Sequence, residues 1–322
     1  MENICNWKIG EKVATREAYG KALAALGAAH DFVVLDADLA EATKTCYFKK
    51  AYPHRFFDCG IAEGNMIGVA AGLAAAGKTV FASSFAMFAA GRAFEQIRNS
   101  VAYPHLNVKI AATHAGITVG EDGATHQCLE DLSLMRTLPG MTVINPADAV
   151  EAAAALEAVL SVDGPCYLRF GRYAMPVFHD PDTYRFRVGK GEVVADGTDV
   201  TLVATGIMVG MAMEAAATLA GEGISARVIN MPTIKPLDEE LILKAARETG
   251  AIVTAEEHNI IGGLGSAVAE TVSEGCPVPV LRVGVADSFG RSGKVPPLLE
   301  LYGLTPAHIC EKAKAALSMK RK

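Results

Sequence analysis

The chain has 322 residues, of which 51% are hydrophobic and 20% are charged, and this composition excludes global disorder and allows sizeable buried cores. At about 150 residues per domain the length favours two domains, with one large α/β domain as the alternative. The 30 basic and 36 acidic residues give a net charge of −6, which argues against a nucleic-acid or anionic-membrane partner. The one locally basic stretch, Lys320-Arg321-Lys322, is typical of a solvated terminus.

Cysteine usage favours a reducing compartment. The seven cysteines are widely spread and include no C-x-x-C pair, so we expect free thiols in a cytoplasmic protein, not a disulfide framework or a zinc site. The N-terminal segment has no apolar core of a signal peptide. Residues 64–91 are the longest apolar region, but Lys78 interrupts them, so we expect a buried helix, turn and strand instead of a membrane span.

Helix and strand patterns alternate along the first half of the chain. In order they predict a helix over 15–26, a strand over 32–35, a helix over 63–76, a strand over 79–83, a helix over 88–101, a strand over 108–113, a strand over 142–144, a helix over 148–160 and a strand over 167–169. Short β-rich runs between helices predict the α/β class, with a mainly parallel sheet covered by helices on both faces.

A change of texture between Phe178 and Gly191, where Pro, Asp and Gly cluster, indicates a linker. A second α/β pattern follows, with a strand over 200–205, a helix over 212–220, a strand over 225–230, a helix over 239–249, a strand over 251–255, a helix over 266–273 and a strand over 280–283. We therefore expect two domains, over residues 8–185 and 192–322.

Three loops that follow predicted strands carry clustered polar residues, at 36–38, 58–65 and 113–127. Ligands bind at the carboxyl ends of strands in parallel α/β sheets, so these loops are candidate site segments. The third loop holds two His, two carboxylates and three Gly within fifteen residues, and ordering such a loop favours function over scaffold. His114 and His126 could form a zinc pair, but no third ligand has metal-like spacing.

Several segments carry a family resemblance. AEGNMIGVAAGLA, SSFAMF, GEDGATHQCLEDLSLMRTLPGMTVINPAD and RFGR resemble, in order and spacing, signature segments of the transketolase family, and EEHNIIGGLGSAV resembles part of its C-terminal domain. The family binds thiamine diphosphate between two kinds of domain, one holding the diphosphate and metal and the other the aminopyrimidine ring. The resemblance implies a pyrimidine-binding domain followed by a smaller, three-layer α/β C-terminal domain.

The family's metal motif, Gly-Asp-Gly with an Asn downstream, does not occur in this sequence, and the first predicted helix begins at Thr15. The resemblance therefore implies the C-terminal subunit of a split, two-subunit transketolase, with no metal site of its own. A separate N-terminal subunit with that motif would share the thiamine diphosphate and hold Mg²⁺ or Ca²⁺. A homodimer of this chain or an α2β2 complex is expected.

The resemblance implies a role for Glu63 as the catalytic carboxyl that hydrogen-bonds a pyrimidine ring nitrogen, among the apolar neighbours Ile61, Ala62, Met66 and Ile67. A helix N-terminal carboxylate favoured by the helix dipole is the alternative. Phe85 and Phe88 match the aromatics that stack on the ring, although from the residues alone two core phenylalanines are favoured. Arg92 would point toward the same site or form an ion pair, and Asp38 matches an acidic residue near the cofactor.

The substrate side is implied in the same way. Asp122 and His126 match the pair that faces the substrate, with Asp122 accepting from a sugar hydroxyl and His126 donating to a developing alkoxide. His114 matches a His beside the sugar phosphate. Structural alternatives are loop-closing hydrogen bonds for Asp122 and buried structural histidines for the other two.

Arg172 and Arg16 match phosphate-binding arginines, whose guanidinium forks fit phosphate oxygens, with surface salt bridges as the alternative. The family also has a Ser in this phosphate clamp. Here Ala42 takes that place, and Thr43 would be an imperfect substitute, which weakens the expectation of a sugar-phosphate donor. Residues 262–265, Gly-Gly-Leu-Gly, could bind an anion at a helix start, but a tight structural turn is favoured.

The resulting hypothesis is transfer of a two-carbon ketol unit from a ketose phosphate to an aldose phosphate. Two related enzymes are alternatives: half of a deoxyxylulose-phosphate synthase-like enzyme, or the β subunit of a 2-oxo-acid dehydrogenase. GEDGATHQ favours the transketolase and synthase branch. A non-catalytic paralogue that assembles with or regulates a partner is the third alternative.

Overall fold

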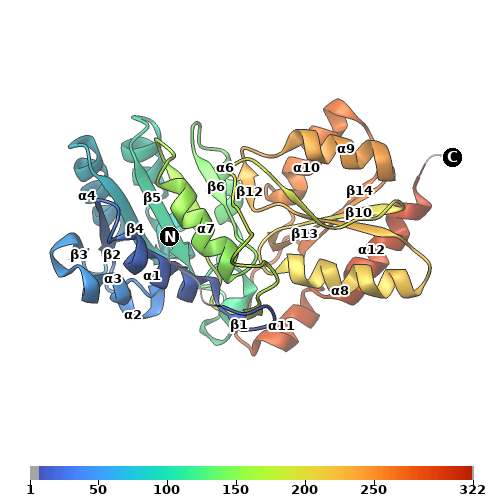
Figure 1. Ribbon diagram of the computed structural model, residues 1–322, viewed down its shortest axis with the longest axis horizontal. Helices are drawn as coiled ribbons and strands as arrows, with labels where there is room; N and C mark the ends of the chain where they lie inside the picture. Colours follow the sequence, from blue (N-terminus) through green and yellow to red (C-terminus); the bar gives the residue numbers. More distant parts are fainter. Residues whose placement is uncertain (1–6, 321–322) are drawn as a thin grey trace.

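The computed structural model describes residues 7–320, and it confirms an α/β architecture with two main sheets (Figure 1). Cys5, Arg321 and Lys322 lie outside the described residues. The first sheet has seven strands in the order β12 (Thr233–Lys235), β6 (Thr142–Ile144), β7 (Cys166–Arg169), β5 (Val108–Thr113), β4 (Thr79–Phe85), β2 (Phe32–Asp36) and β3 (Phe56–Asp58). All neighbours are parallel except β12, which runs antiparallel to β6.

Helices cover both faces of this sheet, as the alternating pattern predicts. One face packs on α1 (Thr15–Leu26), α3 (Cys46–Ala51) and α7 (Ala149–Val159). The other face packs on α4 (Glu63–Ala75), α6 (Asp131–Arg136) and the helical segment 87–102. The expected α-helix over 88–101 is instead two π-helical stretches, Met87–Arg92 and Ile97–Ala102, around the short α5 (Phe94–Gln96). π-Helical turns of this kind are common at functional sites.

The second sheet has the order β14 (Val280–Val285), β13 (Ile252–Asn259), β10 (Val200–Ala204), β11 (Ala226–Asn230) and β9 (Glu192–Ala195). Its strands are parallel except for the edge strand β9. Figure 1 shows α8 (Met208–Gly221) and α12 (Pro306–Ser318) below this sheet, and α9 (Glu239–Thr249) and α10 (Leu264–Gly275) above it. This arrangement confirms the smaller three-layer α/β domain.

The two halves of the chain are tied together by a strand that the sequence patterns did not predict. β12 follows the linker in sequence but completes the edge of the first sheet beside β6. Lys235, at its end, donates its Nζ hydrogens to the backbone oxygens of Arg136 and Leu138 at 2.8 and 2.6 Å. The smaller elements are β1 (Lys12–Val13), α2 (Ala40–Thr43), 3₁₀ turns at Pro53–Arg55 and Ile117–Asp122, β8 (Met175–Pro176) and α11 (Val295–Leu301).

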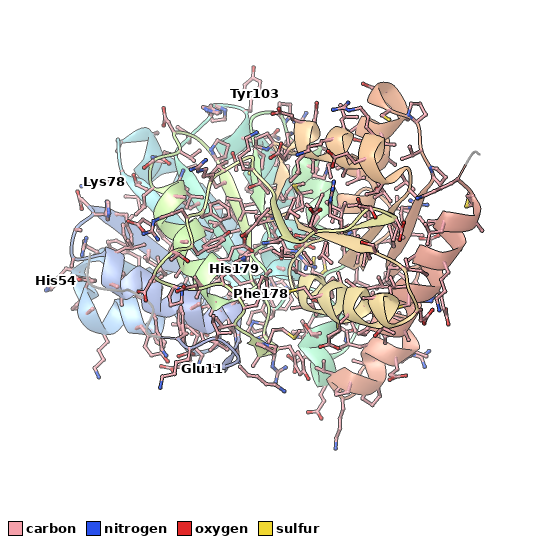
Figure 2. The ribbon with its side chains drawn as sticks, turned by 45° about the vertical axis from the view of Figure 1, so that its right-hand side comes forward. Glu11, His54, Lys78, Tyr103, Phe178 and His179 are labelled. Atoms are coloured by element: carbon pink, nitrogen blue, oxygen red, sulfur yellow. The ribbon has the colours of Figure 1, made fainter. Side chains whose placement is uncertain are left out.

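The linker has no helix or strand between Pro176 and Glu192, and a buried charged cluster fixes it. Figure 2 places Phe178 and His179 in the middle of the molecule, where the two halves meet. Asp148 caps α7 by accepting from the backbone N–H of Glu151 at 2.9 Å, and it accepts from the backbone N–H groups of Phe178 and His179 at 2.9 Å each. Burial opposes a charge on His179, but Asp148 and Glu192, each 3.1 Å from its ring, raise its pKa to about 10.

Six of the seven cysteines and the whole apolar region lie within residues 7–320. All six cysteines in this range are free. The apolar region at 64–91 folds as α4, a turn, β4 and the beginning of the π-helical stretch Met87–Arg92. Within the same range the structure contains no helix with the length and apolar character needed to span a bilayer.

Candidate functional site

Most of the expected site residues gather at one edge of the first sheet, beyond the carboxyl ends of its parallel strands. Asp38 follows β2, Phe85 ends β4, His114 follows β5 and Arg172 follows β7. Glu63 begins α4, next in sequence after the loop that follows β3. The parallel topology therefore brings together residues from five separate segments.

Glu63 is a buried carboxylate with a charged partner. Its side chain is only 2% exposed, and Nη1 of Arg92 lies 2.9 and 2.8 Å from its two oxygens. The π-helical stretch Met87–Arg92 carries Arg92 to this position. The expected apolar setting is incomplete, because Ile61 is 77% exposed, whereas Met66 and Ile67 are fully buried. The main neighbour of the Glu63 carboxylate is therefore the guanidinium of Arg92 and not an apolar side chain.

Two phenylalanines and two histidines form an aromatic cluster beside this ion pair. The rings of Phe85 and Phe88 stack with centroids 5.7 Å apart, and Cζ of Arg92 lies 4.6 Å from the Phe88 centroid. His114 stacks on Phe85 at 3.8 Å, and His126 meets Phe88 edge-on at 5.2 Å. Phe85 is buried, whereas Phe88 is partly exposed, so Phe88 has a ring surface available to a ligand.

His114 is held in one neutral form. Burial, together with the nearby charges of Arg16 and Arg172, lowers its pKa to about 3. Nη1 of Arg16 lies 3.0 Å from Nε2 of His114, and an arginine only donates, so Nε2 must accept. The proton therefore sits on Nδ1 and is donated to Oγ1 of Thr113 at 2.9 Å. His126 is more exposed, and its Nδ1 lies 2.9 Å from Oγ1 of Thr125.

The two arginines of the expected phosphate clamp lie close enough to influence each other. Burial and the charge of Arg172 lower the pKa of Arg16, which also donates to the backbone oxygen of Ala42 at 2.8 Å. Arg172 is 3.1 Å from Asp122 and donates to the backbone oxygen of Val119 at 2.8 Å. An anion placed between these guanidinium groups would relieve their mutual repulsion. Asp122 forms an ion pair with Arg172 in this structure.

The acidic residues after β2 divide into one exposed and one buried side chain. Asp38 is exposed, with a φ of 63°. Asp36, which had no expected role, is fully buried and accepts from the Leu39 N–H and from the hydroxyls of Thr43 and Thr45 at 2.7–2.8 Å. The buried Thr43 hydroxyl thus donates its hydrogen to Asp36, and in this structure it does not point a free donor at the clamp.

The Gly-Gly-Leu-Gly segment is a structural turn, as favoured from the sequence. The carboxylate of Glu256 accepts from the backbone N–H groups of Leu264 and Gly265 at 2.7 and 2.8 Å, so the start of α10 is already occupied. A Cβ at position 263 would lie 1.9 Å from Oε2 of Glu256, which explains the glycine there. The neighbouring Glu257 contacts the loop at 113–127, and no motif assigned it a role.

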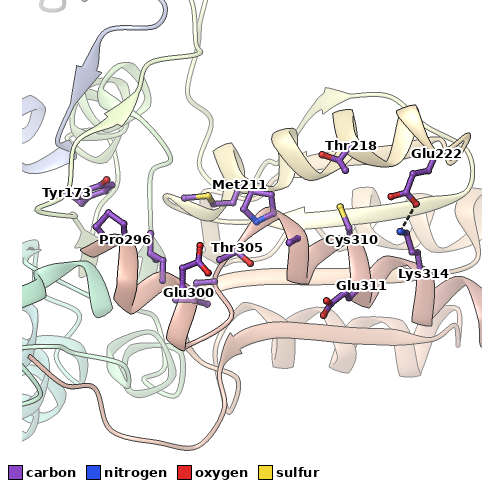
Figure 3. Close-up of a pocket in the computed structure, with 14 residues that line it drawn as sticks. Tyr173, Met211, Thr218, Glu222, Pro296, Glu300, Thr305, Cys310, Glu311 and Lys314 are labelled. Atoms are coloured by element: carbon purple, nitrogen blue, oxygen red, sulfur yellow. Dashed lines mark ion pairs between the residues drawn. The ribbon is translucent and has the colours of Figure 1, made fainter. Parts of the chain in front are cut away.

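A cavity of about 780 Å³ is lined mostly by the second domain, with Tyr173, next in sequence to Arg172, contributing from the first. Figure 3 shows it between α8 and α12, with the ion pair of Glu222 and Lys314 at one end. Cys310 and Met211 line its interior. Across residues 7–320 no three His, Cys, Asp or Glu side chains are arranged to hold a metal ion.

Comparisons with known proteins follow the same division of the chain. Residues 11–177 match the transketolase pyrimidine binding domain, and residues 189–309 match the transketolase C-terminal domain. The chain is 50% identical over 300 residues to a putative transketolase C-terminal section of Methanocaldococcus jannaschii, which covers 92% of this chain and 94% of that protein. It is 50% identical over 281 residues to the 6-deoxy-6-sulfo-D-fructose transketolase subunit SqwH of a Clostridium species, covering 87% of each.

The fold has a solved counterpart. A split gene transketolase, described as an inactive β4 tetramer, is 56% identical to this chain and superposes with a TM-score of 0.90. The superposition covers 96% of this chain and 100% of that one.

Proposed function

Since this chain belongs to the transketolase family and carries its pyrimidine binding and C-terminal domains, we propose that it is the C-terminal subunit of a split, thiamine diphosphate-dependent transketolase. The complete enzyme would transfer a two-carbon ketol unit from a ketose phosphate to an aldose phosphate. The observation that carries this proposal is the buried Glu63 at the start of α4, with the stacked rings of Phe85 and Phe88 beside it.

The residues present fit the aminopyrimidine half of the cofactor. Bound thiamine diphosphate would supply the carbon nucleophile that carries the ketol unit. Glu63 would hold a proton at a ring nitrogen, and Phe88 would stack on the ring, with Phe85 behind it. When no ring is bound, the guanidinium of Arg92 compensates the negative charge of the buried Glu63 carboxylate. Asp38 would lie near the cofactor from the end of β2.

The other half of the cofactor requires a partner. A diphosphate needs a cation and aligned donors, and the described residues offer no metal-binding cluster. We therefore propose a separate N-terminal subunit whose Gly-Asp-Gly motif holds the diphosphate through Mg²⁺ or Ca²⁺. The relative described as an inactive β4 tetramer supports self-association of this chain, and for the complex with the partner we propose an α2β2 assembly. The free thiols support a cytoplasmic location.

The substrate side is proposed from the loop that carries Asp122 and His126. Asp122 would accept from a sugar hydroxyl, and His126 would donate to the alkoxide that develops at the reacting carbonyl. Arg16 and Arg172, with the neutral His114 in contact with Arg16, would hold the anionic end of the sugar. The clamp lacks a hydroxyl because Thr43 is bound to Asp36, and a relative is named for a sulfonated sugar, so a sulfonate is the second candidate anion.

The decisive experiment reconstitutes this chain with its N-terminal subunit and measures ketol transfer. The chain alone should show no transfer. In the complex, Glu63→Ala should lower kcat about 100-fold or more, because the ring nitrogen loses its acid–base partner, while assembly measured by size-exclusion chromatography is retained. Glu95→Ala, an exposed carboxylate on the following helix, is the matched control and should keep near-normal turnover.

The outcomes also separate the alternatives. Normal turnover by Glu63→Ala would remove Glu63 from the mechanism, and activity without a partner would overturn the split-subunit proposal. Decarboxylation of pyruvate would assign the complex to the synthase-like or dehydrogenase-like alternatives. Assembly without any turnover would identify a non-catalytic paralogue. Comparing phosphorylated, sulfonated and neutral ketoses would identify the anion that the arginines recognise.

A further inference from the structure

The loop at residues 114–127, here called the substrate loop, is held by the second domain as well as the first. Glu257 lies on β13, and its Oε1 accepts from the backbone N–H of Thr118 at 2.6 Å. Gly116 packs against the same carboxylate and has a φ of 82°. A Cβ at this position would lie 2.3 Å from Cδ and Oε1 of Glu257. Glycine at 116 is therefore what lets the carboxylate reach the loop.

The other hydrogen bonds between the second domain and this loop join uncharged groups. Nε2 of Gln127 donates to the backbone oxygen of Arg291 at 2.9 Å, and Oγ of Ser292 donates to the backbone oxygen of Glu121 at 2.6 Å. Over residues 7–320, Glu257 is the one ionisable side chain of the second domain with a hydrogen bond to the substrate loop. The hydrogen bonds of Gln127 and Ser292 do not depend on ionisation, whereas the strength of the Glu257 bond depends on whether its carboxyl group is charged.

The surroundings of Glu257 keep its charge sensitive to pH. Burial raises its pKa to about 7, although the charge of Arg169 and the Thr118 N–H oppose the shift. Asp131, on α6, reinforces it and is itself bound to Arg169 and Tyr167 of β7 at 2.8 Å. The flanking side chains on β13 have other partners, since Glu256 caps α10 and Nδ1 of His258 lies 2.7 Å from the Asn259 oxygen.

We propose that Glu257 is a positioning residue, whose carboxylate anchors Thr118 and so sets where Asp122 and His126 stand over the reacting sugar. This inference rests on the function proposed above for the substrate loop. The ionised carboxylate accepts a stronger hydrogen bond than the neutral acid does. The loop is thus fixed most firmly above neutral pH and loosens as Glu257 takes up a proton.

Hydrogen exchange of the chain tests the anchor without any need for activity. In Glu257→Gln, amides of residues 116–123 should exchange about tenfold faster than in the wild type, because the charge-assisted bond to Thr118 is lost. Glu256→Gln is the matched control, since it removes an equally buried carboxylate one residue away and should speed exchange only near Leu264 and Gly265. Glu257→Asp, which keeps the charge but shortens the reach, serves if the glutamine variant does not fold.

A pH series and kinetics complete the test. In the wild type, exchange at Thr118 relative to its intrinsic rate should rise as pH falls through about 7, and this dependence should vanish in Glu257→Gln. In the complex with the N-terminal subunit, Glu257→Gln should lower kcat/KM for the ketose and remove the ionisation near pH 7, with unchanged thiamine diphosphate affinity. Unchanged exchange at 116–123, or equal effects of Glu256→Gln, would overturn the anchor. Absence of wild-type turnover would instead overturn the proposed function.

Discussion

His114 and His179 are both buried histidines, but their surroundings drive them to opposite charge states. His114 stands between Thr113 and the guanidinium of Arg16, and its pKa falls to about 3. His179 stands between Asp148 and Glu192, and its pKa rises to about 10. The first is therefore a neutral hydrogen-bonding ring at the site, and the second is a fixed cation in the junction between the domains.

The neutral state of His114 makes stability depend on pH in a defined direction. Its folded pKa is depressed, so between about pH 6.5 and pH 3 the unfolded chain binds a proton that the folded chain excludes, and stability is lost as pH falls. His114→Asn should remove this contribution. The penalty of the substitution in urea unfolding should therefore shrink by about 1–2 kcal/mol between pH 7 and pH 5. The exposed His54, at the surface in Figure 2, provides the control variant His54→Asn; an equal penalty at both pH values would contradict the neutral assignment.

At the residue scale, sequence reasoning succeeded where partners lie on strands that the topology aligns. It placed the loops that carry Asp38, Glu63 and His114 at the carboxyl ends of strands, which the structure brings to one sheet edge. It missed Glu257, because its partner Thr118 lies 139 residues away and no local pattern links them. It also left the function of Thr43 open, since only the fold shows that the hydroxyl meets the buried Asp36.

At the scale of single elements, α7 illustrates how one cap serves two structures. Asp148 satisfies a helix N-terminal donor and two linker N–H groups, and it faces the cation of His179. Removing it leaves three donors and a buried charge without their acceptor. A cap whose only charged neighbour is a solvent-exposed cation contributes less to the free energy of unfolding.

Asp148→Ala should therefore lower the free energy of unfolding by about 3 kcal/mol or more, in the range found when one partner of a buried ion pair is removed. Asp238→Ala is the comparison, because Asp238 caps α9 through Leu241 at 3.3 Å, accepts from a single linker N–H, that of Gly191 at 3.1 Å, and faces the exposed Lys190 in place of a buried cation. That variant should lose about 1 kcal/mol. Denaturant unfolding measures both values, and equal losses would show that the linker network adds nothing to the cap.

The longer elements were predictable because their patterns are strong, and the exceptions have physical causes. Nine expected strands and six of the expected helices correspond to β2, β4, β5, β6, β7, β10, β11, β13, β14, α1, α4, α7, α8, α9 and α10. The expected helix over 88–101 failed in type, because π-helical turns leave no mark in apolar periodicity. β12 was missed, although β6 is equally short, because Pro232 and Pro236 flank it and prolines so close together indicate a turn. α12 was missed although Thr305 and Pro306 form a recognisable start.

At the scale of the whole molecule, the two domains share their cores and do not simply touch. One hydrophobic cluster runs from α4 and β4 in the first domain to α9 and α10 in the second. β12 adds backbone pairing across the same boundary, and Lys235 adds hydrogen bonds to the last residue of α6 and to the turn that follows it. The first domain therefore depends on residues beyond the linker.

A fragment of residues 1–185 should accordingly be much less stable than the intact chain. It lacks β12, so the edge of β6 is unpaired, and unpaired edges promote association. Thermal unfolding should show a lowered Tm or no cooperative transition, and light scattering should show aggregates. A synthetic peptide of residues 230–238 should raise the Tm by restoring the edge. A monomeric fragment that unfolds cooperatively near the Tm of the intact chain would contradict this dependence.

The return of β12 to the first sheet also affects how the protein is made. A ribosome completes β6 early, but residues 145–232 must be translated before the strand that pairs with it exists. Domains that fold as the chain emerges normally finish in sequence order. Here the first sheet stays open while the opening strands of the second domain are synthesised, so the nascent chain passes through a stage in which both domains are unfinished at once.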